Sequence, residues 1–465
     1  MPNDILLITK REGSKPFPQA NNSRRGLHRQ SWASAFAALL LAFICLPVTM
    51  ADLSLDVLIQ TALQENPGLD AQQKRANAAE AAQRQARAAY YPQLGASAEY
   101  MITDNAPQAF MLELQQRQLD MNDPTFNPNQ PDDTANLQMA IGIQHAVFDR
   151  SRGPQREAAR LQAGMQQENL AASRNALVHA VTQGYYQVLE AQAFASVQDA
   201  AQKSFAESLR IAKERYASGA ALKTDVLNLE VQLAQANENV IRAQNGIQLA
   251  IAALNAAIGK EVVPEAGLSK PDLDITAWDK DEISISRRPE LTAAQLQRDT
   301  AKQQIDVARA ARYPSMHAFG SVMWDGEDIG DRENSYLAGV ALQWSWFDGG
   351  LTRAQTDEAR AMHQSAKAGE RDLREQLQLE SKQAMLHLQE AWQRIEVTEH
   401  ARKSAEEALR ITRALYEEGA ADIASLLLAE TASTETNMRA NAARYDYLIA
   451  KSHARRVAGK FAENF

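Results

Sequence analysis

The side chains that could catalyse a reaction or bind a metal show no spacing that either chemistry requires. The eight histidines are scattered, and the sequence has no His-Glu-x-x-His pair, no Gly-x-Ser-x-Gly turn and no glycine-rich phosphate loop. Most acidic residues lie three or four positions from a lysine or arginine, the spacing of ion pairs along a helix. Cys45 is the single cysteine, so paired thiol sites are excluded. The sequence therefore predicts a protein that is not an enzyme and has no cofactor or metal site.

Polar residues do gather in a stretch that occurs twice. The sequence RYASGAALKTDVL, which begins at Arg215, returns two hundred residues later as LYEEGAADIASLL. Each copy places a glycine directly after a helical pattern, and glycine enters the left-handed conformation at little cost. We expect Gly219 and Gly419 to end two helices, with Thr224 or Asp225 capping the helix after the first. These two helix–turn–helix stretches are called the elbows below.

The elbows belong to a repeat that covers most of the chain. The segment ARAAYYP at 86–92 recurs as ARAARYP at 308–314, and Phe148-Asp149 matches Phe347-Asp348. The offset between the copies falls from 222 to 199 residues, so the first copy has 23 extra residues before Phe148. Each copy has the pattern helix, two short strands, very long helix, elbow, helix. We predict a signal peptide at 1–51, the first repeat at 52–259, a linker at 260–288 and the second repeat at 289–465.

Four stretches alternate apolar and polar residues, which predicts strands with one apolar face. Aromatic residues near the ends of the last two are typical of the girdle of an outer-membrane β-barrel. Two soluble hairpins would show the same alternation, so this alternative stays open at this point. The predicted strands are 93–103, 136–148, 315–324 and 336–347, and the girdle residues are Trp324, Trp344 and Trp346.

Four strands are too few to close a barrel, since roughly eight are needed and open edges are not tolerated in lipid. Several chains must then share one barrel. The long helices fit such an assembly, because residues 150–217 have no proline after Pro154 and would extend about 100 Å. After the first elbow, apolar residues from Val226 onward recur every three or four positions, which predicts left-handed coiled-coil packing.

The N-terminal segment indicates export. Arg24, Arg25 and Arg29 precede an apolar run at 32–46, as in a secretory signal peptide. Cys45 lies inside that run, so lipid attachment at Cys45 is an alternative that the sequence leaves open. The chain has a net charge of −9, and the basic segment before residue 52 makes the remainder more acidic still. We therefore expect no binding to nucleic acid.

These features together resemble the TolC family of outer-membrane factors over nearly the whole chain after the signal segment. The resemblance rests on the paired helix–strand–strand–helix copies, the Phe-Asp pair after each second strand and the elbow RYxxGxxxxTDVLN. It implies a mainly α fold with a small β portion, in which a homotrimer forms a twelve-stranded barrel in outer-membrane lipid. A helical barrel then continues the channel through the periplasm.

The resemblance also implies roles for elbow residues. In the family, the elbows form the periplasmic tip, where an adaptor (membrane fusion protein) and an inner-membrane RND or ABC pump dock. Bonds between the elbows hold the closed state, so Asp225 and Tyr416 are the expected latch. A capping role for Asp225 and a packing role for Tyr416 are the alternatives. The positions carried over are Gly219, Thr224, Asp225, Asn228, Tyr416 and Gly419.

The aperture departs from the family pattern, in which the second elbow carries an arginine and two constricting aspartates. Here Ala421 replaces the arginine, and neither aspartate is present. Three nearby acidic side chains, repeated around a trimer, could restore a negative potential, but a solvated helix end is the simpler explanation of them. The candidate aperture residues are Glu417, Glu418, Asp422, Ser425 and Leu428.

Two functions follow from different readings of the strands. The first is the passive outer-membrane channel of a tripartite efflux or type I secretion system, opened at its tip by an adaptor and a pump. The second is a secreted coiled-coil scaffold without channel activity. The sequence does not identify the exported substrate, and drugs, metal ions and proteins all remain possible. The extra residues fall in the loop at 104–133, which the resemblance places outside the cell.

Overall fold

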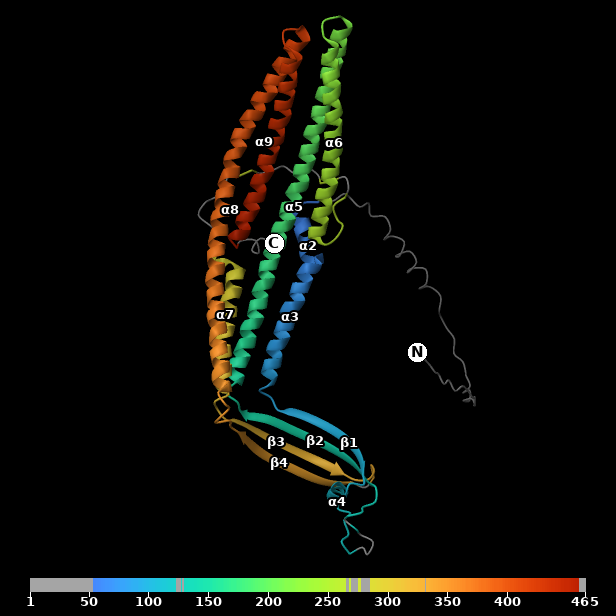
Figure 1. Cartoon of the computed structure of the whole chain (residues 1–465), viewed down its shortest axis with the longest axis vertical. Coiled ribbons are helices and arrows are strands. Elements are labelled where there is room, and N and C mark those ends of the chain that lie inside the picture. Colours follow the sequence, from blue (N-terminus) through green and yellow to red (C-terminus); the bar gives the residue numbers. More distant parts are fainter. Residues whose placement is uncertain are drawn as a thin grey trace, which may run out of the picture. The chain divides into compact units, whose positions relative to one another are not determined.

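The computed structural model describes residues 53–122, 127, 129–264, 267–268, 275–276, 285–330 and 332–459. The predicted signal peptide with Cys45, and most of the linker, lie outside the described residues. The described part is mostly helical and contains one sheet (Figure 1). In chain order, its elements are α2 (Leu55–Glu65), α3 (Pro67–Ala88), β1 (Gln93–Thr103), α4 (Ala106–Gln115), β2 (Thr134–Phe148), α5 (Arg152–Ala217), α6 (Lys223–Ile258), the short 3₁₀ helix η2 (Ile285–Arg287), α7 (Pro289–Ala310), β3 (Ser315–Asp325), β4 (Glu333–Gln343), α8 (Leu351–Glu418) and α9 (Ile423–Val457).

The four strands form an antiparallel sheet in the order β1-β2-β3-β4. The register sets Ala96 opposite Ile141 and Ile141 opposite Val322, so alternate residues of every strand share one face. This apolar face is largely exposed within the chain, and the other face is mostly polar or small. The alternation predicted from the sequence is confirmed. The apolar face includes Leu94, Tyr100, Ile102, Ile141, Ile143, Val322, Tyr336, Val340 and Leu342.

The fourth strand differs from its prediction. β4 spans Glu333–Gln343, so the predicted range 336–347 starts late and extends too far. Its partner β3 begins at Ser315, directly after Pro314, and the last residue pair is Ser315 with Gln343. Proline has no N–H with which to continue the ladder. The strand therefore ends where its partner ends, although the alternation in the sequence continues.

This correction changes the predicted aromatic girdle. Trp324 lies on β3 as expected. Trp344 and Trp346 lie beyond β4, in the connection to α8, and both are exposed. The Trp344 indole donates a hydrogen bond to the Arg312 carbonyl at 3.1 Å. Two of the three tryptophans thus lie at the junction between sheet and helices.

The segment at 104–133 is also more ordered than a loop. It contains α4, which Asn105 caps by accepting a hydrogen bond from the Gln108 N–H. Pro107 lies in the first turn, where a missing N–H costs nothing. At its other end, the buried Gln116 side chain donates to the Ala135 carbonyl of β2 at 2.7 Å. The helix is therefore anchored at the far end of the sheet (Figure 1).

The long helices extend from the sheet to the elbows. α5 has 66 residues and α8 has 68 residues, and each turns back through a glycine into α6 or α9. Both elbows lie at the end of the helices opposite the sheet (Figure 1). In the described part of the chain, no helix combines the length and the apolar character that a membrane crossing requires.

Apolar clusters hold the helices together, and two of them each join four or more helices. One lies around the middle of α5 and joins α2, α6, α8 and α9, with Leu254, Ile258 and Tyr447 fully buried. The other lies next to the elbows and joins α5, α6, α8 and α9. Its buried members are Phe205, Leu209, Ile211, Ala212, Val226, Leu229, Ala236, Tyr416 and Leu426.

Asn66→Ala should lower the stability of the chain by about 1 kcal/mol, the usual cost of losing a helix N-cap. The Asn66 carboxamide accepts from the Leu69 N–H at 2.9 Å and donates to the Ala257 carbonyl at 2.8 Å, so it joins the start of α3 to the end of α6. The thermal unfolding midpoint in detergent measures the loss. Asn77→Ala, on the exposed face of α3, is the matched control, and an equal shift in both variants would contradict the capping role.

Candidate functional site at the two elbows

The first elbow forms as the sequence predicts. Gly219 follows α5 with φ of +77°, a conformation that favours glycine. Asp225 lies in the first turn of α6, where its carboxylate accepts a hydrogen bond from the Leu222 N–H at 3.3 Å. Thr224 and Asn228 are exposed on the same helix. Asp225 therefore caps the helix, and the two exposed side chains are accessible to a partner.

The second elbow has the same backbone turn with different side chains. Gly419 has φ of +82° and ends α8. Asp422 caps α9 by accepting from the Ser425 N–H at 2.8 Å, and hydrogen bonding with Ser425 holds the pKa of Asp422 below its ordinary value. This carboxylate is thus ionised at neutral pH. All five candidate aperture residues are exposed: Glu417, Glu418, Asp422, Ser425 and Leu428.

Asp225 and Tyr416, the expected latch, do not hydrogen-bond to each other here. The Tyr416 ring is buried, and its hydroxyl has no hydrogen-bond partner among the described residues. Burial, together with the nearby charge of Asp225, raises the pKa of Tyr416, so the hydroxyl stays protonated. The Asp225 carboxylate instead accepts a hydrogen bond from the Leu222 N–H at the start of α6. Within one chain, Asp225 caps α6 and Tyr416 packs in the apolar cluster, and their role as a latch stays a prediction.

Arg215 makes the connection between the elbows. Its guanidinium lies 4.9 Å from the centre of the Tyr416 ring and donates to the Tyr416 carbonyl. A second donor reaches the Ala220 carbonyl at 3.1 Å. Carbonyls at a helix C-terminus lack partners within the helix and favour a cation. One side chain of α5 thus joins the end of α8 to the turn of the first elbow. It lies in the quoted elbow motif, where Leu415 replaces it in the second copy.

Tyr416→Phe should leave the resting conductance unchanged within error, because the hydroxyl it removes has no partner among the described residues. Tyr416→Ala should raise the conductance, since it removes the buried ring and its contact with Arg215. Single-channel recording of both variants in a planar bilayer makes the comparison. A large increase with Tyr416→Phe would show that the hydroxyl does latch the closed state.

A buried ionic network joins three of the long helices close to the elbows. Glu430 of α9 is only 1% exposed and accepts from Arg413 of α8 at 2.6 Å. Its two carboxylate oxygens also accept from Ser204 at 2.6 Å and Ser208 at 3.0 Å, both on α5. The Arg413 guanidinium contacts Ser204 as well. The network therefore joins α5 to the α8–α9 pair and satisfies a carboxylate that would be costly to bury alone.

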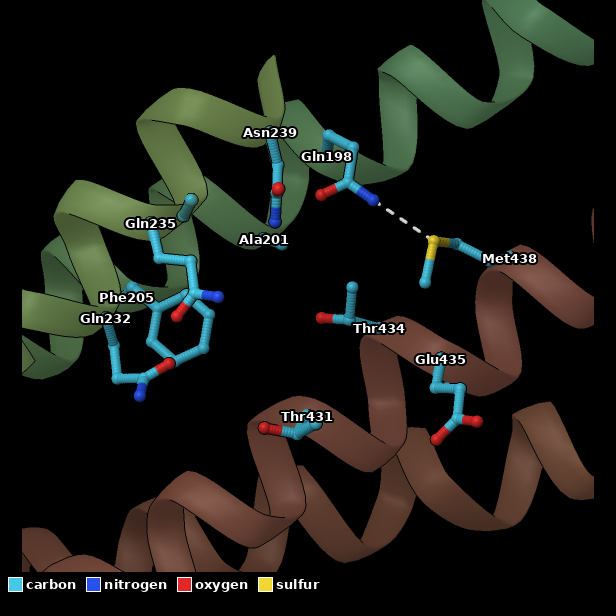
Figure 2. Close-up of a pocket in the computed structure, with 11 residues that line it drawn as sticks. Gln198, Ala201, Phe205, Gln232, Gln235, Asn239, Thr431, Thr434, Glu435 and Met438 are labelled. Carbon is cyan, nitrogen blue, oxygen red and sulfur yellow. Dashed lines mark hydrogen bonds between the residues drawn. The ribbon is translucent and has the colours of Figure 1, made fainter. Parts of the chain in front are cut away.

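A cavity of about 270 Å³ with polar and apolar walls lies beside this network, between α5, α6 and α9 (Figure 2). Figure 2 shows amide side chains from α5 and α6 facing threonines of α9, and the Gln198 amide donates to the Met438 sulfur at 3.0 Å. Its one acidic group, Glu435, forms an ion pair with Arg439. The lining includes Gln232, Gln235, Asn239, Thr431 and Thr434. Such a cavity can hold water or a polar side chain but offers no nucleophile with an adjacent base.

The site has contacts that sequence reasoning did not identify. Three side chains bridge helices through partners elsewhere in the chain. The partner of Arg215 is 201 positions away, that of Arg413 is 17 positions away, and the most distant partner of Glu430 is 226 positions away. Within the described residues, no group of three or more His, Cys, Asp or Glu side chains is arranged to hold a metal ion. The elbow end thus combines an apolar cluster with polar bridges between two helix pairs.

Comparison with known proteins identifies the family. A model of the outer membrane efflux protein family matches residues 58–260 and 282–460. Among curated relatives, the outer membrane protein TolC of Vibrio cholerae is 23% identical over 343 residues, which is 70% of this chain and 77% of TolC. The outer membrane protein OprJ of Pseudomonas aeruginosa is 27% identical over 278 residues, 57% of each chain.

Solved structures share the fold. The outer membrane protein VceC of Vibrio cholerae aligns with a TM-score of 0.74 and 22% identity, covering 87% of this chain and 96% of VceC. The CmeC outer membrane channel of Campylobacter jejuni aligns with a TM-score of 0.77 and 15% identity, covering 87% and 85%. The family match spans both repeats and both elbows. The chain therefore belongs to the outer membrane efflux protein family, the TolC family, and is an efflux channel that lies in the outer membrane and extends into the periplasm.

Proposed function

We propose that three copies of this chain form the exit duct of a tripartite efflux or type I secretion system. Within one chain, β1 and β4 are the edges of the sheet. Their unpaired N–H and C=O groups would be costly in lipid, where no water satisfies them. Pairing of β1 in one copy with β4 in the next removes every edge, and three four-stranded sheets exceed the roughly eight strands that a barrel requires.

One observation carries the proposed opening mechanism: polar bridges join the elbow ends of two helix pairs. Arg215 joins α5 to the end of α8, and Glu430 joins α9 to α5. Polar contacts of this kind can exchange their partners for water when the helix pairs separate. The tip is closed at rest, and hairpins of an adaptor (membrane fusion protein) wedge between the helix pairs and separate them near Gly219 and Gly419.

The exposed surface of the elbows supports docking of an adaptor. Thr224 and Asn228 on α6 are accessible side chains at the tip, where the adaptor docks. The exposed Glu417, Glu418 and Asp422, repeated in a trimer, give the mouth a negative potential. An inner-membrane RND or ABC pump supplies the energy and selects the cargo, because the chain itself is passive. Residues 1–51 are removed on export, and the two repeats with their linker form the mature subunit.

The test is single-channel conductance of the detergent-purified protein in a planar lipid bilayer, with its mass in detergent measured in parallel. Small discrete current steps from a particle of three chains support the proposal. A particle of another size would contradict the trimer, and a trimer without current at any voltage would contradict the channel. Addition of the purified adaptor should then increase the conductance, and no increase would contradict opening at the tip.

A further inference from the structure

The junction between the sheet and the long helices is rich in exposed aromatic side chains. Trp346 is 88% exposed, Phe347 is 87% exposed and Tyr91 is 69% exposed. Strands β1 and β3 begin here and β2 and β4 end here, so the apolar face of the sheet ends at the same level. We call this junction the rim. Its exposed aromatic residues include Tyr90, Tyr91, Phe148, Tyr313, Trp344, Trp346 and Phe347.

Three arginines stand over two of the rim tyrosines. The Arg150 guanidinium lies 4.3 Å from the centre of the Tyr313 ring. Those of Arg152 and Arg156 lie 5.8 Å and 5.7 Å from the centre of the Tyr90 ring. Arg152 also donates to the Ala146 carbonyl at 2.5 Å. The rings hold the guanidinium groups in place by cation–π contact and leave donors at their edges.

The rim has an excess of positive charge. Residues 84–92, 149–157, 306–313 and 348–353 contain eight arginines and four acidic residues, whereas the whole chain has a net charge of −9. Among the described residues, neither Arg150 nor Arg156 forms an ion pair with a carboxylate, and both are exposed. The nearby Asp149 instead accepts hydrogen bonds from Ser151. Within the described part of the chain, neither guanidinium group therefore has a carboxylate within ion-pair distance.

The location of the excess positive charge indicates which kind of ligand the rim binds. Aromatic side chains concentrate where a membrane protein leaves the hydrocarbon and meets the headgroups. Basic side chains at that level attract anionic lipids, and an arginine matches a phosphate with two parallel hydrogen bonds. We propose that the three arginines and two tyrosines of the rim form a binding site for the headgroups of anionic phospholipids. The inference rests on the proposed placement of the sheet in lipid.

Fluorescence quenching by brominated phospholipids tests the site, because Trp344 and Trp346 lie at the rim. The full chain is reconstituted in phosphatidylcholine vesicles, and brominated phosphatidylglycerol or brominated phosphatidylcholine is added in separate series. We expect the wild type to bind the anionic lipid more tightly, by about fivefold for each arginine that contacts a headgroup. Arg150→Gln/Arg156→Gln should lose this preference.

The matched control is Arg210→Gln/Arg242→Gln, which removes two exposed arginines distant from the rim and should retain the wild-type preference. Mass in detergent verifies that each variant keeps the wild-type assembly. An unchanged preference in Arg150→Gln/Arg156→Gln would overturn the assignment. Loss of the preference in millimolar inorganic phosphate would assign the site to free phosphate and overturn the lipid.

The same experiment separates the two proposals. If both brominated lipids quench the tryptophans equally in the wild type, the sheet is in lipid and only the headgroup site is wrong. If neither lipid quenches any variant, the tryptophans do not contact lipid and the placement of the sheet is wrong as well.

Discussion

Arg413→Ala is expected to shift the elbow ends of the channel from closed toward open by a factor of about 100, because removing one partner of a buried ion pair costs about 3 kcal/mol. Glu430 is only 1% exposed, and without Arg413 its charge would have two serine hydroxyls as its remaining donors. The cost falls on the closed state, since separation of the helix pairs brings water to the carboxylate. The open probability in single-channel records measures the shift.

A matched control and a rescue make this prediction specific. Arg439→Ala breaks an ion pair with Glu435 on the same helix, but both side chains are exposed, so the open probability should not change. Combining Arg413→Ala with Glu430→Gln should restore most of the closed state, because the neutral amide can accept from one serine hydroxyl and donate to the other. If Arg413→Ala is no more open than Arg439→Ala, the network does not hold the tip closed.

The sequence was sufficient for features that depend on local or repeated patterns. Pro67 at the start of α3 and the two elbow glycines were placed correctly, because each has a conformational preference that needs no knowledge of distant residues. The paired faces of the sheet also followed from alternation alone. α4 could have been found in the same way, since Asn105 and Pro107 form a helix start.

The features that were missed depend on partners far away in the chain. The end of β4 is set by Pro314 in the neighbouring strand, so the alternation through Trp346 was misleading. The bridges made by Arg215 and Glu430 connect residues about two hundred positions apart. In a single sequence, these residues look the same as the many exposed charges on the long helices. Their role depends on which helices pack against each other in the folded chain.

Acidification should destabilise the chain between pH 6.5 and about pH 4 through His179. This histidine of α5 shares a hydrogen bond of 2.9 Å with Ser452 and lies against His453, with ring centroids 5.4 Å apart. Burial, with smaller effects from the positive charges of His453 and Arg456, lowers the pKa of His179 from 6.5 to about 4, and the charge of Glu380 opposes this shift.

The sign follows from proton binding in the two states. Below pH 6.5 the unfolded chain protonates at this histidine, whereas the folded chain does not until the pH approaches about 4. The unfolded state therefore binds more protons across this window, and stability falls as the pH falls. The full shift corresponds to about 3 kcal/mol, which we reduce to about 2 kcal/mol because the ring is only partly buried.

Other groups around His179 do not produce the same window. The Glu380 carboxylate faces the cluster from α8, and a hydrogen bond with His453, together with Arg288 and Arg456, lowers the pKa of Glu380 to about 2. Its contribution to stability is complete above pH 4.5 and is lost below that, as the pH falls toward 2. Loss of stability above pH 4.5 therefore reports on histidine and not on this carboxylate.

Thermal unfolding midpoints of the detergent-solubilised protein from pH 7 to pH 4.5 provide the measurement. We expect His179→Gln to flatten the pH dependence, because glutamine keeps a hydrogen-bonding group for Ser452 without a proton to gain. His400→Gln, on the exposed face of α8, should keep the wild-type slope. If His179→Gln keeps the wild-type slope, the pH dependence does not arise from this partly buried ring.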